Sequence, residues 1–364
     1  MNKSRKLLLC LLVTICVSLW WFKSSSLIIR NPFDEGKKAL TFGKDYNNGT
    51  VARENTGKEA LIFNNEDAPH YINEAVATEN RKKVAKIMQP WQTIQIYRPN
   101  VDPMDMHWSR NIKQLRGSNQ TDWIERRVKS CAVVGNSGIL LGSNCGQTID
   151  NMDLIIRMNL AEFGHEYSSD VGSKVSFTTI NREQLRLVLP CFLNMTKAGK
   201  VKVPLGNATT PVLSTECDTF IKRFRLLNDD VLWLFKGRLP GLQELLSLLR
   251  KRFGLGFKFA YSPVDPIGPS VKLWKFKAPT SGLAMYTAAT QLCDEITLFG
   301  FYPFYTDNYN RTILHHYYEP ELKEAVVHHN MPLEYKTLLE FEKKGALRIL
   351  NNCTTSGNEK HAES

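Results

Sequence analysis

The chain has 364 residues, of which 43% are hydrophobic, and a formal net charge of +11. Its length and apolar content allow one large α/β domain, or two small ones, together with a non-globular segment. The positive charge favours anionic partners such as nucleotide phosphates, acidic sugars or lipid headgroups, although a solvated basic surface explains it equally well.

An apolar segment near the N-terminus predicts the compartment. Residues 7–22 contain no charged side chain, and they follow a basic tail at residues 1–6. A cleaved signal peptide is the alternative, but no small-residue cleavage pattern follows the segment. We therefore expect an N-terminal transmembrane signal-anchor, with residues 1–6 in the cytosol and the rest of the chain in a lumen. A lumenal position excludes nucleic acid as a partner.

The lumenal position also predicts N-glycosylation. Six Asn-x-Ser/Thr sequons follow the apolar segment, and each can carry a glycan on a surface loop unless it is a chance match. The asparagines are Asn48, Asn119, Asn194, Asn207, Asn310 and Asn352.

Cysteine usage agrees with an oxidising compartment. Two of the eight cysteines lie in the apolar segment, and the other six follow it. An even number of lumenal cysteines indicates disulfides, but six cysteines allow 15 pairings and the spacing does not choose among them. These six are Cys131, Cys145, Cys191, Cys217, Cys293 and Cys353.

Composition divides the lumenal part into three. We expect a polar stem at residues 23–89, a globular domain at residues 90–355 and a short tail at residues 356–364. Short β-like runs alternate with helical patterns in the domain, which predicts a Rossmann-like α/β fold with a mostly parallel sheet flanked by helices. The expected strands lie at residues 132–134, 154–158, 175–180, 231–235, 257–261 and 295–301, and helical patterns lie at residues 239–253 and 281–292.

The first candidate site is the turn after the apolar run at residues 131–134. Gly135, Asn136, Ser137 and Gly138 turn the backbone there toward a helix. Junctions of this kind bind phosphates in α/β folds. The two glycines do not complete a GxGxxG fingerprint, so a turn without a ligand is the alternative.

A second candidate is the start of the helix expected at residues 281–292. Thr280, Ser281 and Gly282 place hydroxyls and backbone N–H groups at the positive end of the helix dipole, which is an anion site. The alternative is that Thr280 or Ser281 is only an N-cap.

Two histidine clusters follow, at residues 315–319 and 328–334. Imidazole titrates near neutrality, so one ring nitrogen can accept a proton from an attacking hydroxyl while a partner such as Glu334 holds the other. Neither cluster has a zinc-binding spacing, and the sequence contains no Asp-x-Asp pair to bind the metal of a sugar nucleotide. We expect metal-independent chemistry without a cofactor.

Four stretches together resemble the motifs of the eukaryotic sialyltransferases, and they stand in that family's order. CAVVGNSGIL and the residues up to 181 resemble the large sialyl motif, and PTSGLAMYTAATQLCDEITLFGF resembles the small motif. HHYYE resembles the third motif, and the spacing from His329 to Glu334 resembles the very small motif. The resemblance implies the sialyltransferase-type variant of the GT-A glycosyltransferase fold, with CMP-sialic acid as the donor.

Within that family the chain is most similar to the α-2,8-sialyltransferase branch. The features that indicate this branch are Cys145, which is followed by glycine, and Cys353 near the C-terminus. The resemblance implies one disulfide between Cys131 and Cys293 and another between Cys145 and Cys353. It leaves the two remaining lumenal cysteines either bridged or free.

The resemblance also implies roles for individual residues. His316 would neutralise the departing phosphate and His329 would be the general base, whereas His315 and His328 are expected to be surface neighbours. Donor-binding roles fall on Asn136, Ser137, Asn159, Thr280, Ser281, Gly282 and Tyr302. Tyr302 stands where the family usually has tryptophan, and its smaller ring would stack less tightly on substrate. Arg182 and Glu183 replace the family's Pro-Ser pair, and residues 236–238 also differ from it, so the choice of acceptor does not carry over.

The expected function is therefore transfer of sialic acid from CMP-sialic acid to a terminal sialic acid on a glycolipid or glycoprotein, with inversion and through an α-2,8 linkage. The expected location is the Golgi membrane, as a single-pass type II protein, and a homodimer is left open. Two alternatives are a processive polysialyltransferase acting on N-glycans and a catalytically impaired lumenal partner of another glycosyltransferase.

Overall fold

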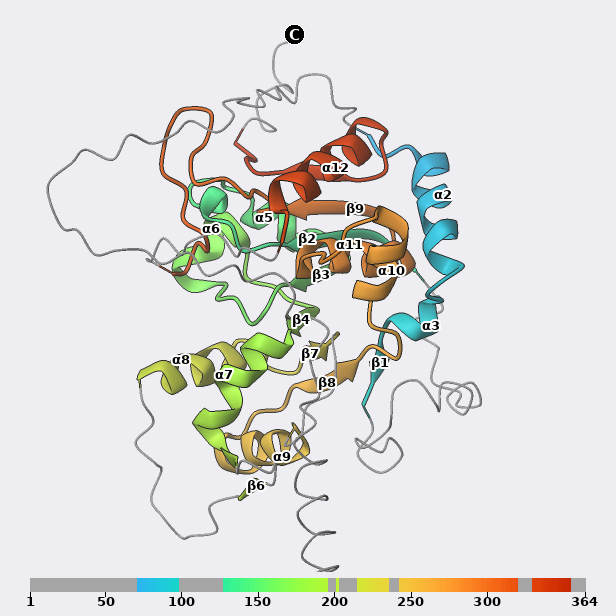
Figure 1. Ribbon diagram of the computed structural model, residues 1–364. Coiled ribbons are helices and arrows are strands. Elements are labelled where there is room, and N and C mark those ends of the chain that lie inside the picture. Colours follow the sequence, from blue (N-terminus) through green and yellow to red (C-terminus); the bar gives the residue numbers. More distant parts are fainter. Residues whose placement is uncertain are drawn as a thin grey trace, which may run out of the picture. The chain divides into compact units, whose positions relative to one another are not determined.

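The computed structural model describes residues 71–97, 127–195, 201–202, 215–235, 242–319 and 329–354, which belong to one compact unit, Ile62–Ser364 (Figure 1). The expected cytosolic tail, the anchor at residues 7–22 and most of the stem lie outside these residues, as do Asn48, Asn119 and Asn207. Across the described ranges, no helix is both long enough and apolar enough to cross a membrane.

An eight-stranded sheet organises this unit, in the order β1-β8-β7-β4-β3-β2-β9-β10. Each neighbouring pair is parallel except β1 with β8, so the predicted mostly parallel sheet is confirmed. The strands are β1 Gln95–Ile96, β2 Val128–Val134, β3 Leu154–Arg157, β4 Phe177–Ile180, β7 Val231–Leu234, β8 Lys258–Tyr261, β9 Cys293–Phe299 and β10 Arg348–Leu350, and a separate antiparallel pair is formed by β5 Asn194–Met195 and β6 Val201–Lys202.

Helices cover both faces of the sheet, because successive side chains of a strand point to opposite faces. In β2, Cys131 and Val133 join one apolar cluster, while Ala132 and Val134 join another. The helices are α2 Glu74–Ala85, α3 Pro90–Thr93, α5 Gly146–Asp150, α6 Ser168–Val171, α7 Arg182–Phe192, α8 Thr215–Arg225, α9 Leu242–Phe253, α10 Ile267–Trp274, α11 Ser281–Leu292 and α12 Met331–Lys343, with single 3-10 turns at Gly138–Leu140 and His165–Tyr167.

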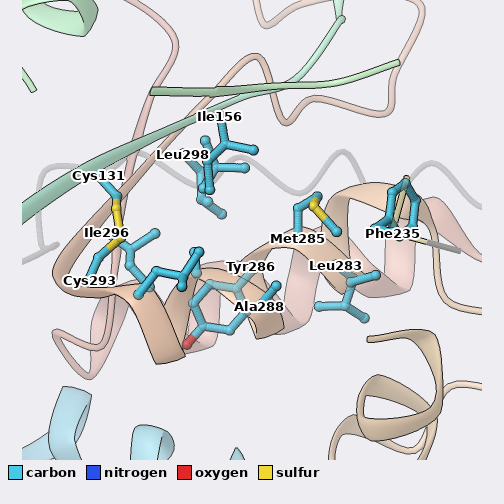
Figure 2. Packing of buried hydrophobic residues seen from close by; sticks show 14 of the residues in the cluster. Cys131, Ile156, Phe235, Leu283, Met285, Tyr286, Ala288, Cys293, Ile296 and Leu298 are labelled. Atoms are coloured by element: carbon cyan, nitrogen blue, oxygen red, sulfur yellow. A yellow bond between two sulfur atoms is a disulfide. The ribbon is translucent and has the colours of Figure 1, made fainter. Parts of the chain in front are cut away.

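Helix α11 lies at the centre of the core, with the bounds that the sequence predicts. Each residue from Leu283 to Leu292 is buried, as expected of a helix that is apolar on all sides. Figure 2 shows Leu283, Met285 and Tyr286 along this helix, in the same apolar cluster as strand residues such as Leu298. The hydroxyl of Tyr286 accepts a hydrogen bond from Asn80 Nδ2 at 3.3 Å, which satisfies the polar end of a fully buried ring.

Helix α2 falls in the range that was expected to be stem. It packs on the globular fold, where Arg81 Nε donates to the carbonyl of Thr290 at the end of α11 and Arg81 Nη2 to that of Cys293 at the start of β9. Only three of its twelve residues are buried, so its sequence carries little apolar periodicity. The globular fold therefore extends N-terminal to Pro90.

Three disulfides connect the unit. The bridges Cys131–Cys293 and Cys145–Cys353 are present, as the resemblance implies, and the remaining lumenal cysteines form a third bridge, Cys191–Cys217. Cys131 and Cys293 belong to β2 and β9, which are parallel neighbours, so sheet pairing brings the two cysteines together. The third bridge joins α7 to α8.

Loop length predicts how much each bridge stabilises the fold. In the chain-entropy model, the Cys145–Cys353 bridge, which spans 208 residues, contributes about 5.4 kcal/mol, and the Cys191–Cys217 bridge, which spans 26 residues, contributes about 3.5 kcal/mol. Replacing the first pair with alanine should lower the free energy of unfolding by about 2 kcal/mol more than replacing the second pair. Urea denaturation of the two double variants measures this, and a larger loss from the shorter bridge would contradict it.

Candidate active site

A pocket of about 380 Å³ lies where β2, β3, β4 and β9 end. This is the edge at which parallel α/β sheets bind ligands, and the volume falls in the range of small-molecule sites. The nine predicted catalytic and substrate-binding residues all line it: Asn136, Ser137, Asn159, Thr280, Ser281, Gly282, Tyr302, His316 and His329. The structure thus gathers residues that are nearly 200 positions apart in the chain.

The floor of the pocket depends on two glycines that meet after β2 and β9. Gly135 N donates to the carbonyl of Phe299 at 2.7 Å, and a Cβ on Gly135 would lie 2.6 Å from the carbonyl oxygen of Gly300. Gly300 itself has a φ of +68°, a conformation that residues with a Cβ rarely adopt. Larger residues at either position would force the two strand ends apart.

Two asparagines contribute buried amides to the pocket. Asn136 Nδ2 donates to the carbonyl of Met158 and to the hydroxyl of Tyr318, at 3.3 and 3.2 Å. Asn159 has a φ of +55°, and its backbone N–H donates to Thr179 Oγ1. Among the described residues, the Oδ1 atoms of Asn136 and Asn159 are buried and have no hydrogen-bond donor. A ligand hydroxyl or amino group can supply it.

Thr280 is the N-cap of α11, and it binds a buried carboxylate. Its Oγ1 accepts from Leu283 N and donates to Glu334 Oε2 at 2.5 Å, and its N–H donates to Glu334 Oε1 at 2.9 Å. The N-cap interpretation of Thr280 is therefore confirmed. Within the described part of the chain, the N–H groups of Ser281 and Gly282 have no acceptor, so they are the donors that the helix start offers to a ligand.

Glu334 does not hold His329, contrary to the expectation from their spacing. His329 Nδ1 lies 2.7 Å from the carbonyl oxygen of Ala278, while both carboxylate oxygens of Glu334 contact Thr280. A carbonyl can only accept, so this contact assigns the proton of neutral His329 to Nδ1 and leaves Nε2 as an acceptor. The sequence could not choose between these partners, because Ala278 contributes only its backbone.

His316 is held by a charged partner instead. Its Nδ1 lies 2.9 Å from Glu319 Oε2, which forms an ion pair when the imidazole is protonated. Its ring also stacks on Tyr318, with centroids 5.4 Å apart and planes at 21°. His315, which was expected to be a surface neighbour, is half-buried, contacts the His316 ring and lines the pocket. His328 lies outside the described residues.

An aromatic cluster closes one side of the pocket. The rings of Tyr302, Phe304 and Tyr335 contact one another edge to face, with centroids 5.2 to 5.8 Å apart. Tyr302 OH donates to the carbonyl of Thr306, and burial raises the pKa of Tyr302. The sequence identified only Tyr302, since Phe304 and Tyr335 belong to ordinary apolar patterns.

Three other residues that line the pocket are not among the site residues that the sequence predicts. Asn181, Glu183 and Gln184 reach the pocket from the start of α7, where Asn181 caps the helix by accepting from Gln184 N. Their signal in the sequence is that they follow an apolar strand at the ligand-binding edge, and Glu183 stands out in addition as a departure from the family's Pro-Ser pair. In the described ranges, no three His, Cys, Asp or Glu side chains are grouped so that they could hold a metal ion.

Comparison with known proteins assigns the family. The model of glycosyltransferase family 29 (sialyltransferase) matches residues 62–201 and 267–346, which is more than half of the chain. The chain belongs to this family. The sialyltransferase motifs are therefore the source of the residues that converge on the pocket.

Similar proteins include an alpha-N-acetylneuraminide alpha-2,8-sialyltransferase of Xenopus laevis, 32% identical over 239 residues that cover 63% of this chain and 60% of the relative. The Bos taurus protein of the same name is 31% identical over 61% of this chain and 58% of its own. The match therefore spans about 60% of the length of these relatives.

Among solved structures, a mammalian sialyltransferase aligns with a TM-score of 0.39 at 19% identity, over 76% of this chain and 79% of that one. A mammalian sialyltransferase in complex with Gal-beta-1-3GalNAc-ortho-nitrophenol aligns with the same score and identity, over 78% and 82%.

The contact between Thr280 and Glu334 predicts a stability difference. Thr280→Val keeps the shape of the side chain but removes the N-cap and one donor to a buried carboxylate, and should cost about 2 to 3 kcal/mol of unfolding free energy. Thr280→Ser keeps the hydroxyl and should cost less than about 1 kcal/mol. Urea denaturation of both variants tests this, and equal losses would show that the hydroxyl contributes nothing.

The burial of Glu334 predicts a dependence on pH. Burial raises the pKa of Glu334, and the hydrogen bonds from Thr280 only partly offset this. The folded protein then keeps the proton to a higher pH than the unfolded chain, so the unfolding free energy falls as pH rises from the unfolded pKa through the folded one. Glu334→Gln abolishes this fall.

Denaturation of wild type and Glu334→Gln at several pH values from 4 upward measures the effect. The stability of the variant relative to wild type should increase across this window. A relative stability that stays constant with pH would contradict the raised pKa.

Proposed function

We propose that the protein transfers sialic acid from CMP-sialic acid to a terminal sialic acid of a glycan, through an α-2,8 linkage and without a metal ion. Family membership supports a sugar-nucleotide donor and a glycan acceptor. The α-2,8 linkage is supported by the names of relatives at about 30% identity. The observation that carries the proposal is that the four sialyltransferase motifs line one pocket at the ligand-binding edge of the sheet.

The polar groups of the pocket fit such a donor. The buried Oδ1 atoms of Asn136 and Asn159 need donors, which the hydroxyl and amino groups of a nucleoside supply. The N–H groups of Ser281 and Gly282 are donors at the positive end of α11, and they suit a phosphate or carboxylate. Donor groups and acceptor groups therefore lie in one pocket, as a ligand with both kinds of polar group requires.

The two histidines differ in their partners, and this supports different roles. His329 is held through Nδ1 by a backbone carbonyl, so Nε2 is ready to remove the proton from an acceptor hydroxyl. His316 is held by the Glu319 carboxylate, with which a protonated ring forms an ion pair. An imidazolium at this position neutralises the negative charge that develops on the departing phosphate.

The reaction that follows is a single displacement. The acceptor oxygen attacks the anomeric carbon as the bond to the phosphate oxygen breaks, and the electron pair leaves with CMP. The hydroxyl proton passes to His329 Nε2. Attack from the face opposite to the leaving group inverts the configuration of the anomeric carbon.

We further propose that the protein is a single-pass type II glycoprotein of the Golgi membrane, with its catalytic domain in the lumen. The apolar segment at residues 7–22 and the sequons support this. Two of the sequon asparagines, Asn310 and Asn352, are exposed in the structure, as glycan addition requires.

The role of His329 is tested by substitution. His329→Ala should lower kcat for transfer from CMP-sialic acid by about 100-fold or more, because it removes the proton acceptor. His165→Asn is the matched control, since His165 is exposed in the turn His165–Tyr167 and asparagine tolerates its positive φ of 47°. It should leave kcat unchanged, whereas an equally active His329→Ala protein would refute the assignment.

The acceptor is tested by mass analysis of the products from a sialylated glycolipid, a sialylated glycoprotein and their galactose-terminated counterparts. The proposal expects one or a few α-2,8-linked residues on sialylated acceptors only. Transfer to galactose-terminated acceptors would indicate another branch of the family, and long chains would indicate a polysialyltransferase. No transfer by the folded protein would refute an enzymatic function.

A further inference from the structure

Arg223 contacts Tyr318, a neighbour of two pocket residues, from a segment that the family model does not match. It lies on α8, Thr215–Arg225, between the matched ranges 62–201 and 267–346. Its side chain is only 10% exposed although it carries a charge, and arginine is rarely buried without a partner. Neither the sequence motifs nor the pocket lining includes it.

The partners of Arg223 are Glu162 and Tyr318, which do not themselves line the pocket. Its Nε donates to Glu162 Oε1 at 3.1 Å, and its guanidinium carbon lies 4.7 Å from the centroid of the Tyr318 ring. Both contacts fix a flexible side chain, one as an ion pair and the other as a cation–π interaction. Because Glu162 already pairs with the positive charge, the guanidinium is suited to holding the ring of Tyr318 rather than to acting on a distant phosphate.

Tyr318 connects Arg223 with two residues of the pocket. Its ring stacks on His316, and its hydroxyl accepts a hydrogen bond from Asn136 Nδ2. A shift of the ring therefore changes the orientation of His316 and of the Asn136 amide together. Rotation of that amide would also move its Oδ1, the buried acceptor that we assign to the donor nucleotide.

Glu162 adds a second connection to the same loop. Its backbone carbonyl accepts a hydrogen bond from the Tyr317 hydroxyl, and Tyr317 N donates to the carbonyl of Asn136 at 2.8 Å. The carboxylate and the carbonyl of one residue thus hold Arg223 and Tyr317. Arg223 and the two tyrosines thus form one support of the loop, and Glu319, which lies 2.9 Å from the Nδ1 of His316, is another.

We propose that Arg223 is a positioning residue for the sialyltransferase reaction, which orients His316 and Asn136 through Tyr318 and Glu162. This inference rests on the proposed function, because it assigns to His316 and Asn136 their contacts with the donor. It predicts that the loss of Arg223 impairs use of CMP-sialic acid and leaves the acceptor affinity unchanged.

Arg223→Met tests the inference in the full-length protein, since methionine keeps an unbranched side chain but removes the charge and the donors. It should lower kcat about tenfold through His316 and raise KM for CMP-sialic acid about fivefold through Asn136, with the acceptor KM unchanged. Arg223→Lys keeps the charge near the ring and should recover part of both losses. Arg225→Met, an exposed position on the same helix, is the matched control and should behave as wild type.

The donor KM separates positioning from a merely structural role, because partial unfolding lowers the active fraction and with it kcat but does not change KM. A fall in kcat with unchanged donor KM would overturn the inference, as would wild-type kinetics in a folded Arg223→Met protein. If that variant does not fold, Tyr318→Phe removes only the hydroxyl that binds Asn136. It should raise the donor KM, and an unchanged donor KM would also overturn the inference.

The two proposals fail in distinguishable ways. If the unmodified protein transfers no sialic acid, the proposed function is wrong, and so are the roles of His316 and Asn136 in donor binding. If the unmodified protein is active and the Arg223 variants match it, only the positioning role is wrong.

Discussion

The pairing of β2 with β9 is the constraint on which the rest of the site depends. The two strands are parallel neighbours with Val134 opposite Phe299, so the residues that follow them, Gly135 and Gly300, meet at the same edge of the sheet. Helix α11 leads directly into β9 and runs back along the sheet, so its N-terminus lies at that edge too. One strand pairing therefore brings the first motif, the helix start and the aromatic cluster together, although about 160 residues separate Cys131 from Cys293.

The structure explains the spacing from His329 to Glu334. Asn330 caps α12 by accepting from Leu333 N, so His329 stands just before the helix and Glu334 lies one turn inside it. The carboxylate is 4% exposed and binds Thr280 at the start of α11. Burying a carboxylate costs free energy, and a pair of donors reduces that cost. The contact ties the two helix starts together and so fixes the place of His329 beside the pocket.

The sequence predicts the sheet well because parallel strands that are buried on both faces read as continuous apolar runs. The run at residues 231–235 and the run at residues 295–301 are of this kind, and they contribute to the interior strands β7 and β9. The edge strands β1 and β10 have only two and three residues, too few for a pattern. The sequence of α2 resembles a polar stem because only three of its twelve residues are buried.

The sequence motifs predict which residues line the candidate site, but not which groups hold those residues in place. The nine predicted residues line one pocket, but their partners depend on three-dimensional packing. The carbonyl that holds His329 belongs to Ala278, whose side chain gives no signal. Arg223 lies in a basic stretch of α8 that reads as a solvated helix end, and only the fold brings it to Tyr318. A sequence pattern carries no information on contacts of this kind, because they join residues that are distant in the chain.

The segment between the motifs both lines the pocket and is fastened to the rest of the fold. At its start, α7 contributes Glu183 and Gln184 to the pocket. The Cys191–Cys217 bridge ties α7 to α8, and Arg223 ties α8 to the loop of His316. The covalent bridge and the guanidinium therefore connect the helix whose start lines the pocket with the loop that holds His316.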